Sequence, residues 1–167
     1  MVCAMWVEQM SLPENRPAAN PRRCTGIFQS VFSAEPHAVR NVLRAAVARF
    51  APKISEGEAG ALELLLAELL NNIVEHGYAY GQAGTISLSI LCDRRGLSCS
   101  LIDDGVPLPP HCLHPPDLPD TGVATENMPE GGFGWFLIHD LARDLRYRRE
   151  AGQNLLEFRL PLSAPET

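Results

Sequence analysis

The 167-residue chain has the length of one domain, long enough to enclose a single hydrophobic core. Hydrophobic residues make up 46% of the chain and charged residues 20%, which excludes the disordered and fibrous classes of protein. Fourteen Lys and Arg against 20 Asp and Glu give a net charge of −6, so we expect no direct contact with nucleic acid. The single lysine, Lys53, is neither preceded by glycine nor followed by Ser or Thr, which excludes a P-loop.

The cysteines predict a reduced, cytoplasmic protein, because their number is odd and no Cys-x-x-Cys pair occurs. There are five of them: Cys3, Cys24, Cys92, Cys99 and Cys112. The first ten residues carry no cationic leader, and Glu8 interrupts their apolar run, so we expect no signal peptide. We also expect no membrane contact, because no apolar stretch has the length of a membrane span.

The chain begins with a segment that predicts a flexible arm. Residues 1–23 contain three prolines and show no periodicity, so we place the domain at residues 24–162 and a short tail at 163–167. A β-branched and aromatic run predicts the first strand within residues 25–33. Apolar residues then recur at helical spacing after Pro36, which predicts a helix.

Residues 55–76 carry the strongest helical pattern of the chain. Their apolar stripe is made of Leu62, Leu65, Leu66, Leu69, Leu70 and Ile73. Gly77 follows at the position where a glycine commonly ends a helix. Two segments with alternating apolar residues, 86–90 and 97–101, predict a β-hairpin after this helix.

The next segment, residues 105–130, predicts a lid or binding loop. It contains seven of the chain's 14 prolines and has no helical or strand period. Residues 131–134 then open a helix, and residues 146–149 and 155–160 predict a closing hairpin. This order of elements predicts an α+β fold with an antiparallel or mixed sheet and helices on one face.

Glu68 and Asn72 are the first candidate functional pair. They lie four residues apart on the long helix, so their side chains are neighbours on its surface. A carboxylate and a carboxamide in this arrangement can supply a general base and an oxygen ligand for Mg²⁺. Taken alone, the pair is also typical of a helix edge with a solvated Glu and a packing Asn.

Two further motifs follow the hairpin and the long loop. Asp103 ends a predicted strand and precedes Gly105 by two residues, so it is a turn former or an acceptor for a ligand amino group. Gly132 and Gly134 stand at a helix start, where exposed backbone N–H groups favour an anion. Taken alone, such a glycine cluster is also compatible with a hinge.

The ordered set Glu68-x-x-x-Asn72, Asp103-x-Gly105 and Gly132-x-Gly134 resembles the N, G1 and G2 boxes of the gyrase, Hsp, histidine kinase and MutL ATPases. The local sequence of residues 67–78 and 131–138 is similar to that of the anti-sigma-factor serine/threonine kinases of bacterial partner switching. Residues 147–154 are similar to the last hairpin of these kinases. The resemblance covers residues 25–162 and implies a two-layer α/β sandwich of the Bergerat type, with a mixed, mainly antiparallel sheet and a long ATP lid.

This resemblance implies a role for each motif residue. Glu68 would be the general base for phosphoryl transfer, and Asn72 would be the Mg²⁺ ligand and part of the ATP or ADP site. Asp103 would hold the adenine amino group with Gly105 beside it. The two remaining cofactor-binding residues, Gly132 and Gly134, would border the phosphates.

The implied function is that of an ATP-dependent serine kinase and anti-sigma factor. It would sequester a sigma factor and phosphorylate an anti-anti-sigma antagonist of the STAS type, and homodimer formation stays open. Pro107 stands where the G1 box often has a second glycine, which favours the alternative of a nucleotide-binding anti-sigma or adaptor module without kinase activity. A third interpretation, the catalytic half of a histidine kinase, is disfavoured, because we expect no room in this chain for a dimerising phosphoacceptor helix pair.

Two further candidate features are Arg40 and a short His and Cys cluster at residues 111–114. Arg40, on the first predicted helix, corresponds to a position at which the family meets its protein partners, although a solvated arginine is the plainer interpretation. His111, Cys112 and His114 are metal-compatible donors in one short cluster. A structural zinc site needs four ligands, and no matching second cluster follows.

Overall fold

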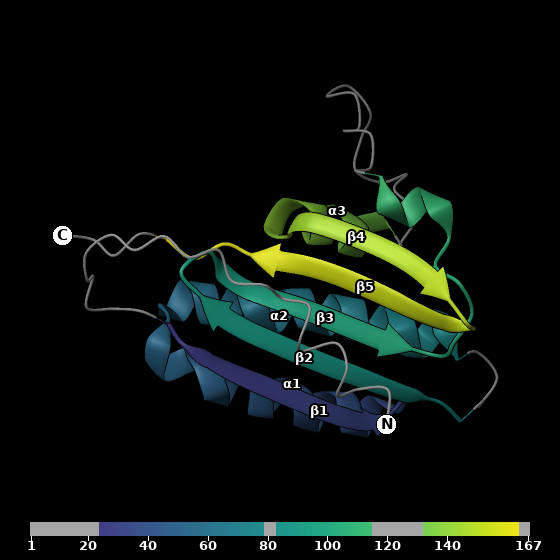
Figure 1. The fold of residues 1–167 in the computed structure, drawn as a ribbon, viewed down its shortest axis with the longest axis horizontal. Helices are drawn as coiled ribbons and strands as arrows, with labels where there is room; N and C mark the ends of the chain where they lie inside the picture. Colours follow the sequence, from purple (N-terminus) through teal and green to yellow (C-terminus); the bar gives the residue numbers. More distant parts are fainter. Residues whose placement is uncertain (1–23, 79–82, 115–131, 164–167) are drawn as a thin grey trace.

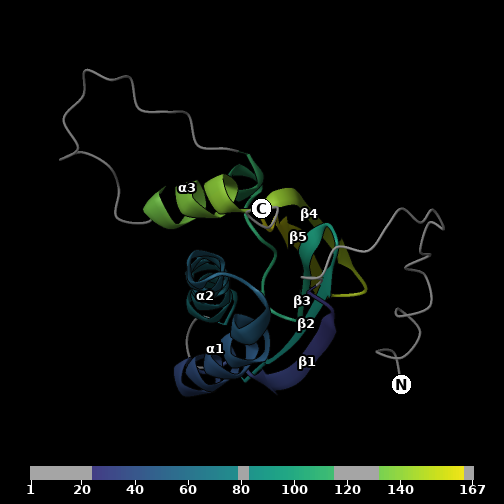
Figure 2. The same ribbon diagram turned by 90° about the vertical axis from the view of Figure 1, so that its left-hand side faces the viewer.

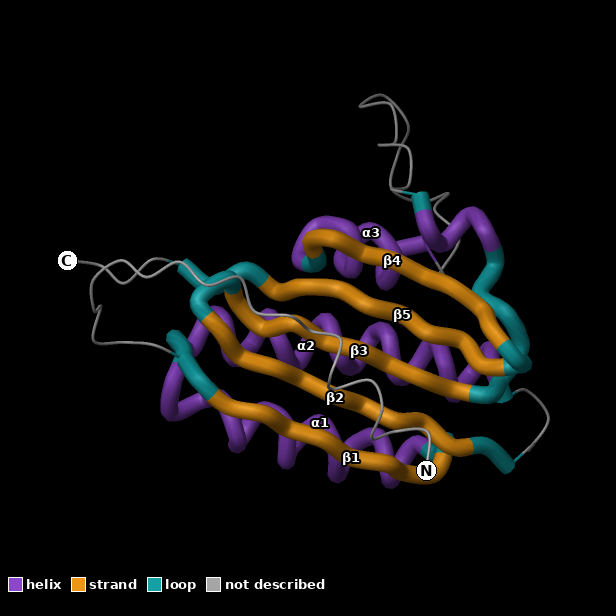
Figure 3. Tube along the Cα trace, in the orientation of Figure 1, coloured by secondary structure: helices purple, strands orange, loops and turns teal. Residues whose placement is uncertain are grey.

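Five antiparallel strands form a sheet with helices on one of its faces (Figures 1 and 2). The computed structural model describes residues 24–78, 83–114 and 132–163. Its main elements in chain order are β1 (Gly26–Ser33), α1 (Pro36–Phe50), α2 (Glu56–Asn72), β2 (Thr85–Asp93), β3 (Gly96–Asp103), α3 (Gly132–Leu141), β4 (Arg143–Glu150) and β5 (Gln153–Leu160). Short helical turns are η1 (Ala51–Lys53), η2 (Ile73–Gly77) and η3 (Pro110–Leu113), as the tube in Figure 3 shows.

The predicted fold class is confirmed. The strand order is β1-β2-β3-β5-β4, and every neighbouring pair is antiparallel, so the mixed sheet considered from the sequence is an antiparallel one. In Figure 2 the three helices lie on the same side of the sheet, with α1 near β1 and α3 near β4. The arm at residues 1–23, the tail residues 164–167 and the loop residues 115–131 lie outside the described residues.

The core forms between α2 and the helix-facing side of the sheet. Alternate residues of β2 point toward the helices, and Ile86, Leu88 and Ile90 are fully buried. The predicted leucine stripe of α2 meets them, because the members at positions 62, 65, 66, 69 and 70 are all buried. The period of two in the strands and the period of 3.6 in the helix therefore bury matching apolar faces.

The long helix begins where its capping residues predict. Ser55 Oγ accepts a hydrogen bond from the Glu58 N–H at 3.3 Å, and Glu58 Oε2 accepts one from the Ser55 N–H at 2.7 Å. This capping box satisfies two of the free N–H groups at the helix start. The other Glu58 oxygen accepts from the Ser163 N–H at 2.6 Å, which holds the chain after β5 against α2.

The end of this helix differs from the sequence prediction. A single α-helix was expected to reach His76, whereas α2 ends at Asn72 and the chain continues as the π-helical turn η2. A π turn widens the helix and shifts the direction of the side chains that follow it. The change occurs at Asn72, one of the predicted functional residues.

The prediction of reduced thiols is wrong for two of the cysteines. Cys24 and Cys92 are joined by a disulfide, with their Cα atoms 5.6 Å apart. The cause is strand register, because Cys92 pairs with Gly26, two residues after Cys24. The bonded residues are 68 positions apart, so no rule based on close cysteine spacing could detect them. Cys99 and Cys112 are buried and free.

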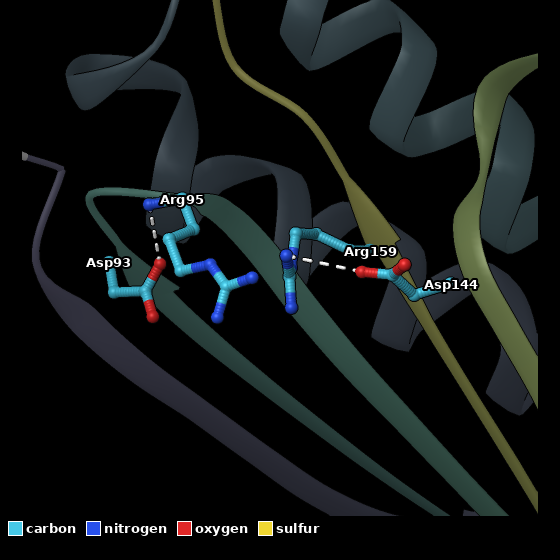
Figure 4. Close-up of polar contacts among 4 residues, drawn as sticks. All are labelled: Asp93, Arg95, Asp144 and Arg159. Atoms are coloured by element: carbon cyan, nitrogen blue, oxygen red, sulfur yellow. Dashed lines mark hydrogen bonds and ion pairs between the residues drawn. The ribbon is translucent and has the colours of Figure 1, made fainter. Parts of the chain in front are cut away.

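Polar contacts at the β2–β3 turn hold the end of the sheet where β3 begins (Figure 4). Asp93 Oδ1 accepts a hydrogen bond from the Arg95 N–H at 2.7 Å. Nearby, Arg159 Nη1 lies 3.2 Å from Asp144 Oδ2, so this ion pair joins β5 to β4. In the described residues, no helix is long and apolar enough to cross a membrane.

Candidate functional site

A cavity of about 130 Å³ lies at the other end of β3, beside the last turns of α2. Its walls come from α2, η2, β3, the chain that follows β3, α3 and the closing hairpin. Its polar lining residues are Asn72, His76, Asp103, Tyr147 and Asn154. Its apolar walls include Leu69, Ile73, Leu108, Trp135 and Leu156. A mostly apolar hollow with a few converging polar groups is the usual form of a small-molecule site.

Asp103 and Asn154 are buried polar residues in this region, each with 5% of its surface exposed. They are cross-strand partners on β3 and β5, so the register of the sheet brings them together. Asn154 Nδ2 donates a hydrogen bond to Asp103 Oδ1 at 2.8 Å, and the Gly105 N–H donates to the same oxygen at 2.9 Å. Within the described residues, Oδ2 of Asp103 has no hydrogen-bond partner, so it can accept one from a ligand.

Burial raises the pKa of the Asp103 carboxyl above its usual range. The hydrogen bonds from Asn154 and the Gly105 N–H act in the opposite direction, and so does the charge of Arg149. A buried carboxylate with one free oxygen gains from a ligand that donates a hydrogen bond to it, because that bond replaces lost hydration.

Asn72 is the second polar group without a full set of partners. Its side chain lines the cavity, and its buried Nδ2 has no hydrogen-bond partner within the described part of the chain. A buried polar atom that lacks a partner is costly, which favours a polar ligand at this position.

Glu68 lies one helical turn before Asn72 and contacts the start of α3. A Cβ added to Gly134 would lie 2.5 Å from Glu68 Oε2, so a larger residue at this position would collide with the carboxylate. The sequence predicted both residues as functional, and the structure brings them together from α2 and α3. Glu68 is half-buried and does not line the cavity itself.

Gly105 lets the chain after β3 pass close to η2. A Cβ at this position would lie 2.8 Å from the carbonyl oxygen of Gly77, which leaves no room for a side chain. The same carbonyl accepts a hydrogen bond from the Val106 N–H at 3.1 Å. Pro107 follows on the exposed rim of the cavity.

The remaining predicted residues lie elsewhere or are only partly described. Gly132 is the first residue of α3, and Gly131 lies outside the described residues. Arg40 is exposed on α1 and does not line the cavity. His111 and His114 are exposed, whereas Cys112 between them is buried.

Sequence reasoning missed the polar residues that support Asp103. Asn154 stands in the inward-facing phase of β5, where the next three members are Leu156, Phe158 and Leu160. A single asparagine in an otherwise apolar inward row was the signal that could have identified it. Tyr78 was also missed: its hydroxyl donates to Asp104, and burial is the main cause that raises its pKa beyond the ordinary range.

The chain is similar to proteins of one family. Residues 32–160 match the family described as Histidine kinase-like ATPase domain. Over 107 residues the chain is 33% identical to the serine/threonine-protein kinase BtrW of Bordetella bronchiseptica. The aligned stretch covers 64% of this chain and 72% of that relative.

A solved structure supports the same fold. The crystal structure of the RsbU and RsbW domains of Rv1364c from Mycobacterium tuberculosis matches 84% of this chain with a TM-score of 0.56 and 19% sequence identity. This chain spans about a third, 34%, of that solved chain. The similarity therefore concerns the arrangement of helices and strands.

Proposed function

Because the chain belongs to the histidine kinase-like ATPase domain family, we propose that it is an ATP-dependent serine protein kinase and anti-sigma factor. In this proposal it phosphorylates a serine of an anti-anti-sigma protein of the STAS type and sequesters a sigma factor. The 33% identity to a protein named as a serine/threonine-protein kinase supports the enzymatic part. The similarity of fold to a structure that contains an RsbW domain is consistent with it.

The observation that carries the proposal is the polar arrangement around the cavity. Asp103 presents a free carboxylate oxygen, and Asn72 presents a buried amide that lacks a partner in the described residues. Apolar side chains such as Ile73 and Leu156 form walls on which a planar base can pack. Asp103 Oδ2 would accept a hydrogen bond from the adenine amino group, which guanine replaces by a carbonyl.

ATP and Mg²⁺ fit the residues that are present. The Asn72 carboxamide oxygen is a hard donor of the kind that Mg²⁺ prefers. The amide nitrogen Nδ2, which is buried and has no partner within the described residues, would donate a hydrogen bond to an acceptor such as a phosphate oxygen. When bound, Mg²⁺ would neutralise charge on the phosphates. Gly134 keeps the start of α3 close to Glu68, and the backbone N–H groups at this helix start would favour the phosphates.

Glu68 would take the proton of the attacking serine. The serine oxygen forms a bond to the γ-phosphorus of ATP while the bond from this phosphorus to the bridging oxygen breaks, so ADP leaves and phosphoserine remains. The hydroxyl proton passes to the Glu68 carboxylate. Phosphoryl transfer needs chiefly positioning and charge neutralisation, and a base adds to them.

One feature favours the second candidate, a nucleotide-binding anti-sigma or adaptor module without kinase activity. Pro107 lines the cavity rim and has no N–H to offer to a phosphate, and its fixed φ stiffens the chain there. Both candidates bind ATP, so only transfer of phosphate separates them. Arg40, exposed on α1, would contact the protein partner in either case.

The test is incubation with Mg²⁺ and ATP labelled at the γ-phosphate, together with a candidate STAS-type antagonist. Label on an antagonist serine supports the kinase, and the antagonist with that serine changed to alanine is the control. Nucleotide binding without transfer to any antagonist that forms a complex supports the adaptor module. A protein that binds neither ATP nor ADP contradicts both candidates.

A further inference from the structure

The closing hairpin holds the cavity rim through three polar side chains, which we call the hairpin clamp: Tyr147 and Arg149 of β4 and Asn154 of β5. Arg149 and Asn154 are partners in the β4–β5 register, and Tyr147 lies two residues before Arg149 on the same face of β4. None of the three was among the predicted functional residues.

The clamp reaches the chain that leaves β3. Asn154 Nδ2 donates to the carbonyl oxygens of Val106 at 3.0 Å and Gly105 at 3.3 Å. Arg149 Nη1 donates to the Gly105 carbonyl at 2.9 Å, and the Leu108 N–H donates to the Tyr147 hydroxyl at 3.0 Å. Four hydrogen bonds from the hairpin therefore fix the backbone of residues 105–108.

The clamp also determines which way the Asn154 amide points. Its Oδ1 accepts hydrogen bonds from Arg149 Nη1 and from the Tyr147 hydroxyl, the latter at 2.8 Å. A guanidinium is a donor only, so Arg149 must face the oxygen and not the NH₂ group. The NH₂ group is then directed at Asp103 Oδ1, where a flipped amide would place oxygen against oxygen.

We propose that the hairpin clamp positions the Asp103 carboxylate and residues 105–108 so that the cavity selects adenine over guanine. This inference rests on the nucleotide binding of the proposed function and adds the residues that set its specificity. Arg149 is the key positioning residue, because it holds the amide of Asn154 in one orientation. Asp103 Oδ1 is then occupied by Asn154 and the Gly105 N–H, and Oδ2 is left for the base.

The experiment compares Arg149→Met with the matched control Arg146→Met. Arg146 lies on the same strand but on its other face, opposite Glu157, and within the described residues no hydrogen bond or ion pair joins it to the clamp. The first readout is the ratio of dissociation constants for GDP and ADP, measured by calorimetry. Arg149→Met should lower this ratio by about tenfold, the effect of one misplaced hydrogen bond, while the control retains it.

Two further variants separate positioning from general damage. Arg149→Lys keeps a donor-only cation and should restore most of the adenine preference. Tyr147→Phe removes the hydrogen bonds to Leu108 and to Asn154 Oδ1 but leaves Arg149 to orient the amide, so it should weaken the preference by a smaller factor. Equal ratios in Arg149→Met, Tyr147→Phe and the control would overturn the proposal.

The second readout needs no nucleotide. Amide hydrogen exchange at Gly105 and Leu108 should accelerate about tenfold in Arg149→Met, whereas amides in the centre of β2 should not change. If the wild-type protein binds neither ADP nor GDP, the proposed function and the selectivity both fail. The exchange rates then test separately whether the clamp holds residues 105–108. Unchanged rates in Arg149→Met would refute that role as well.

Discussion

Two regions of the sheet, both on the face that the helices cover, bury different kinds of group; we call the region at β1 and β2 the apolar side and the region at β3 and β5 the polar side. Between β1, β2 and the helices α1 and α2, the buried side chains are apolar, as Phe50, Leu66 and Ile90 illustrate, each with 0% of its surface exposed. Between β3, β5 and the end of α2, the buried groups include the polar pair Asp103 and Asn154. The apolar side stabilises the fold through the hydrophobic effect. Burial of polar groups on the polar side lowers stability but keeps these groups available to a ligand. The comparison predicts that changes on the first side affect folding and changes on the second affect chemistry.

The largest effect is expected for Glu68→Gln. The amide keeps the shape of the side chain next to Gly134 but cannot take a proton, so phosphoryl transfer to the antagonist should fall by roughly 10²–10⁴-fold. ATP binding and the denaturant midpoint should stay near wild type. The exposed Glu63→Gln on the same helix is the control and should retain full activity. Transfer at the wild-type rate by Glu68→Gln would remove Glu68 from the mechanism.

On the apolar side, Phe50→Ala should lower the free energy of unfolding by about 3–5 kcal/mol. Phe50 ends α1 with no exposed surface, so its removal leaves a cavity that the fixed sheet cannot fill. Urea unfolding followed by circular dichroism measures the change. The folded fraction of the variant should still bind ATP, because Phe50 does not line the cavity. A loss below about 1 kcal/mol would show that this side of the core repacks freely.

Reduction of the Cys24–Cys92 disulfide should lower the free energy of unfolding by about 2–4 kcal/mol. The bond restricts the unfolded chain across a loop of 68 residues, and it lies on the apolar side of the sheet, away from Asp103. Thermal unfolding with and without a thiol reductant measures the loss. The double variant Cys24→Ser, Cys92→Ser is the control, and its unfolding temperature should not respond to the reductant. A wild-type protein that is equally indifferent would contradict the disulfide.

On the polar side, Asp103→Asn should reduce the preference for ATP over GTP by about tenfold, because the carboxylate acceptor is lost. The folding stability of this variant, in contrast, should rise relative to the wild type at neutral pH. Burial holds the pKa of Asp103 above the ordinary value of 3.8, so ionisation opposes folding. The contribution of the carboxyl to stability is fully present below the unfolded pKa and is lost as the pH rises through the folded pKa.

The variant does not titrate at this position, so its stability relative to wild type should increase as the pH is raised from about 3 to neutrality. Urea midpoints at several pH values measure this trend. A wild-type protein that gains stability over Asp103→Asn as the pH rises would show that the hydrogen bonds from Asn154 and Gly105 outweigh burial.

The smallest effect is expected for Ser55→Ala, which removes half of the capping box of α2. The loss should be about 1 kcal/mol, because one N–H at the helix start loses its acceptor. Differential scanning calorimetry of the variant measures it. Nucleotide affinity should not change, since Ser55 is at the far end of the helix from Asn72. An affinity loss would indicate that the cavity depends on the stability of the whole helix.

Local sequence patterns predicted the five strands and the three α-helices of the fold, except for the end of α2. The leucine stripe of α2 and the alternating residues of β2 and β3 depend on neighbours in the chain, so their periods are visible without a structure. The same patterns placed Asn72 on the long helix and Asp103 at a strand end. The cavity that both residues line follows from the packing of α2 against β3.

Features that depend on strand register could not be predicted. Asn154 faces Asp103 because β5 pairs with β3 in one register, and the chain between these strands contains α3 and β4. The Cys24–Cys92 bond depends in the same way on the β1–β2 pairing. The π turn after Asn72 was missed because the helical pattern of apolar residues continues to Ile73, and nothing local marks a change in hydrogen bonding.

The Cys24–Cys92 bond has a further consequence for the covalent topology of the molecule. It makes residues 24–92 a closed ring, which contains α1, α2 and the strands β1 and β2. A protease that cuts this ring once, for example after Lys53 in the exposed η1 turn, opens the ring but releases no fragment. The nicked oxidised chain therefore migrates as one species on a denaturing gel, and it separates into two pieces only after reduction.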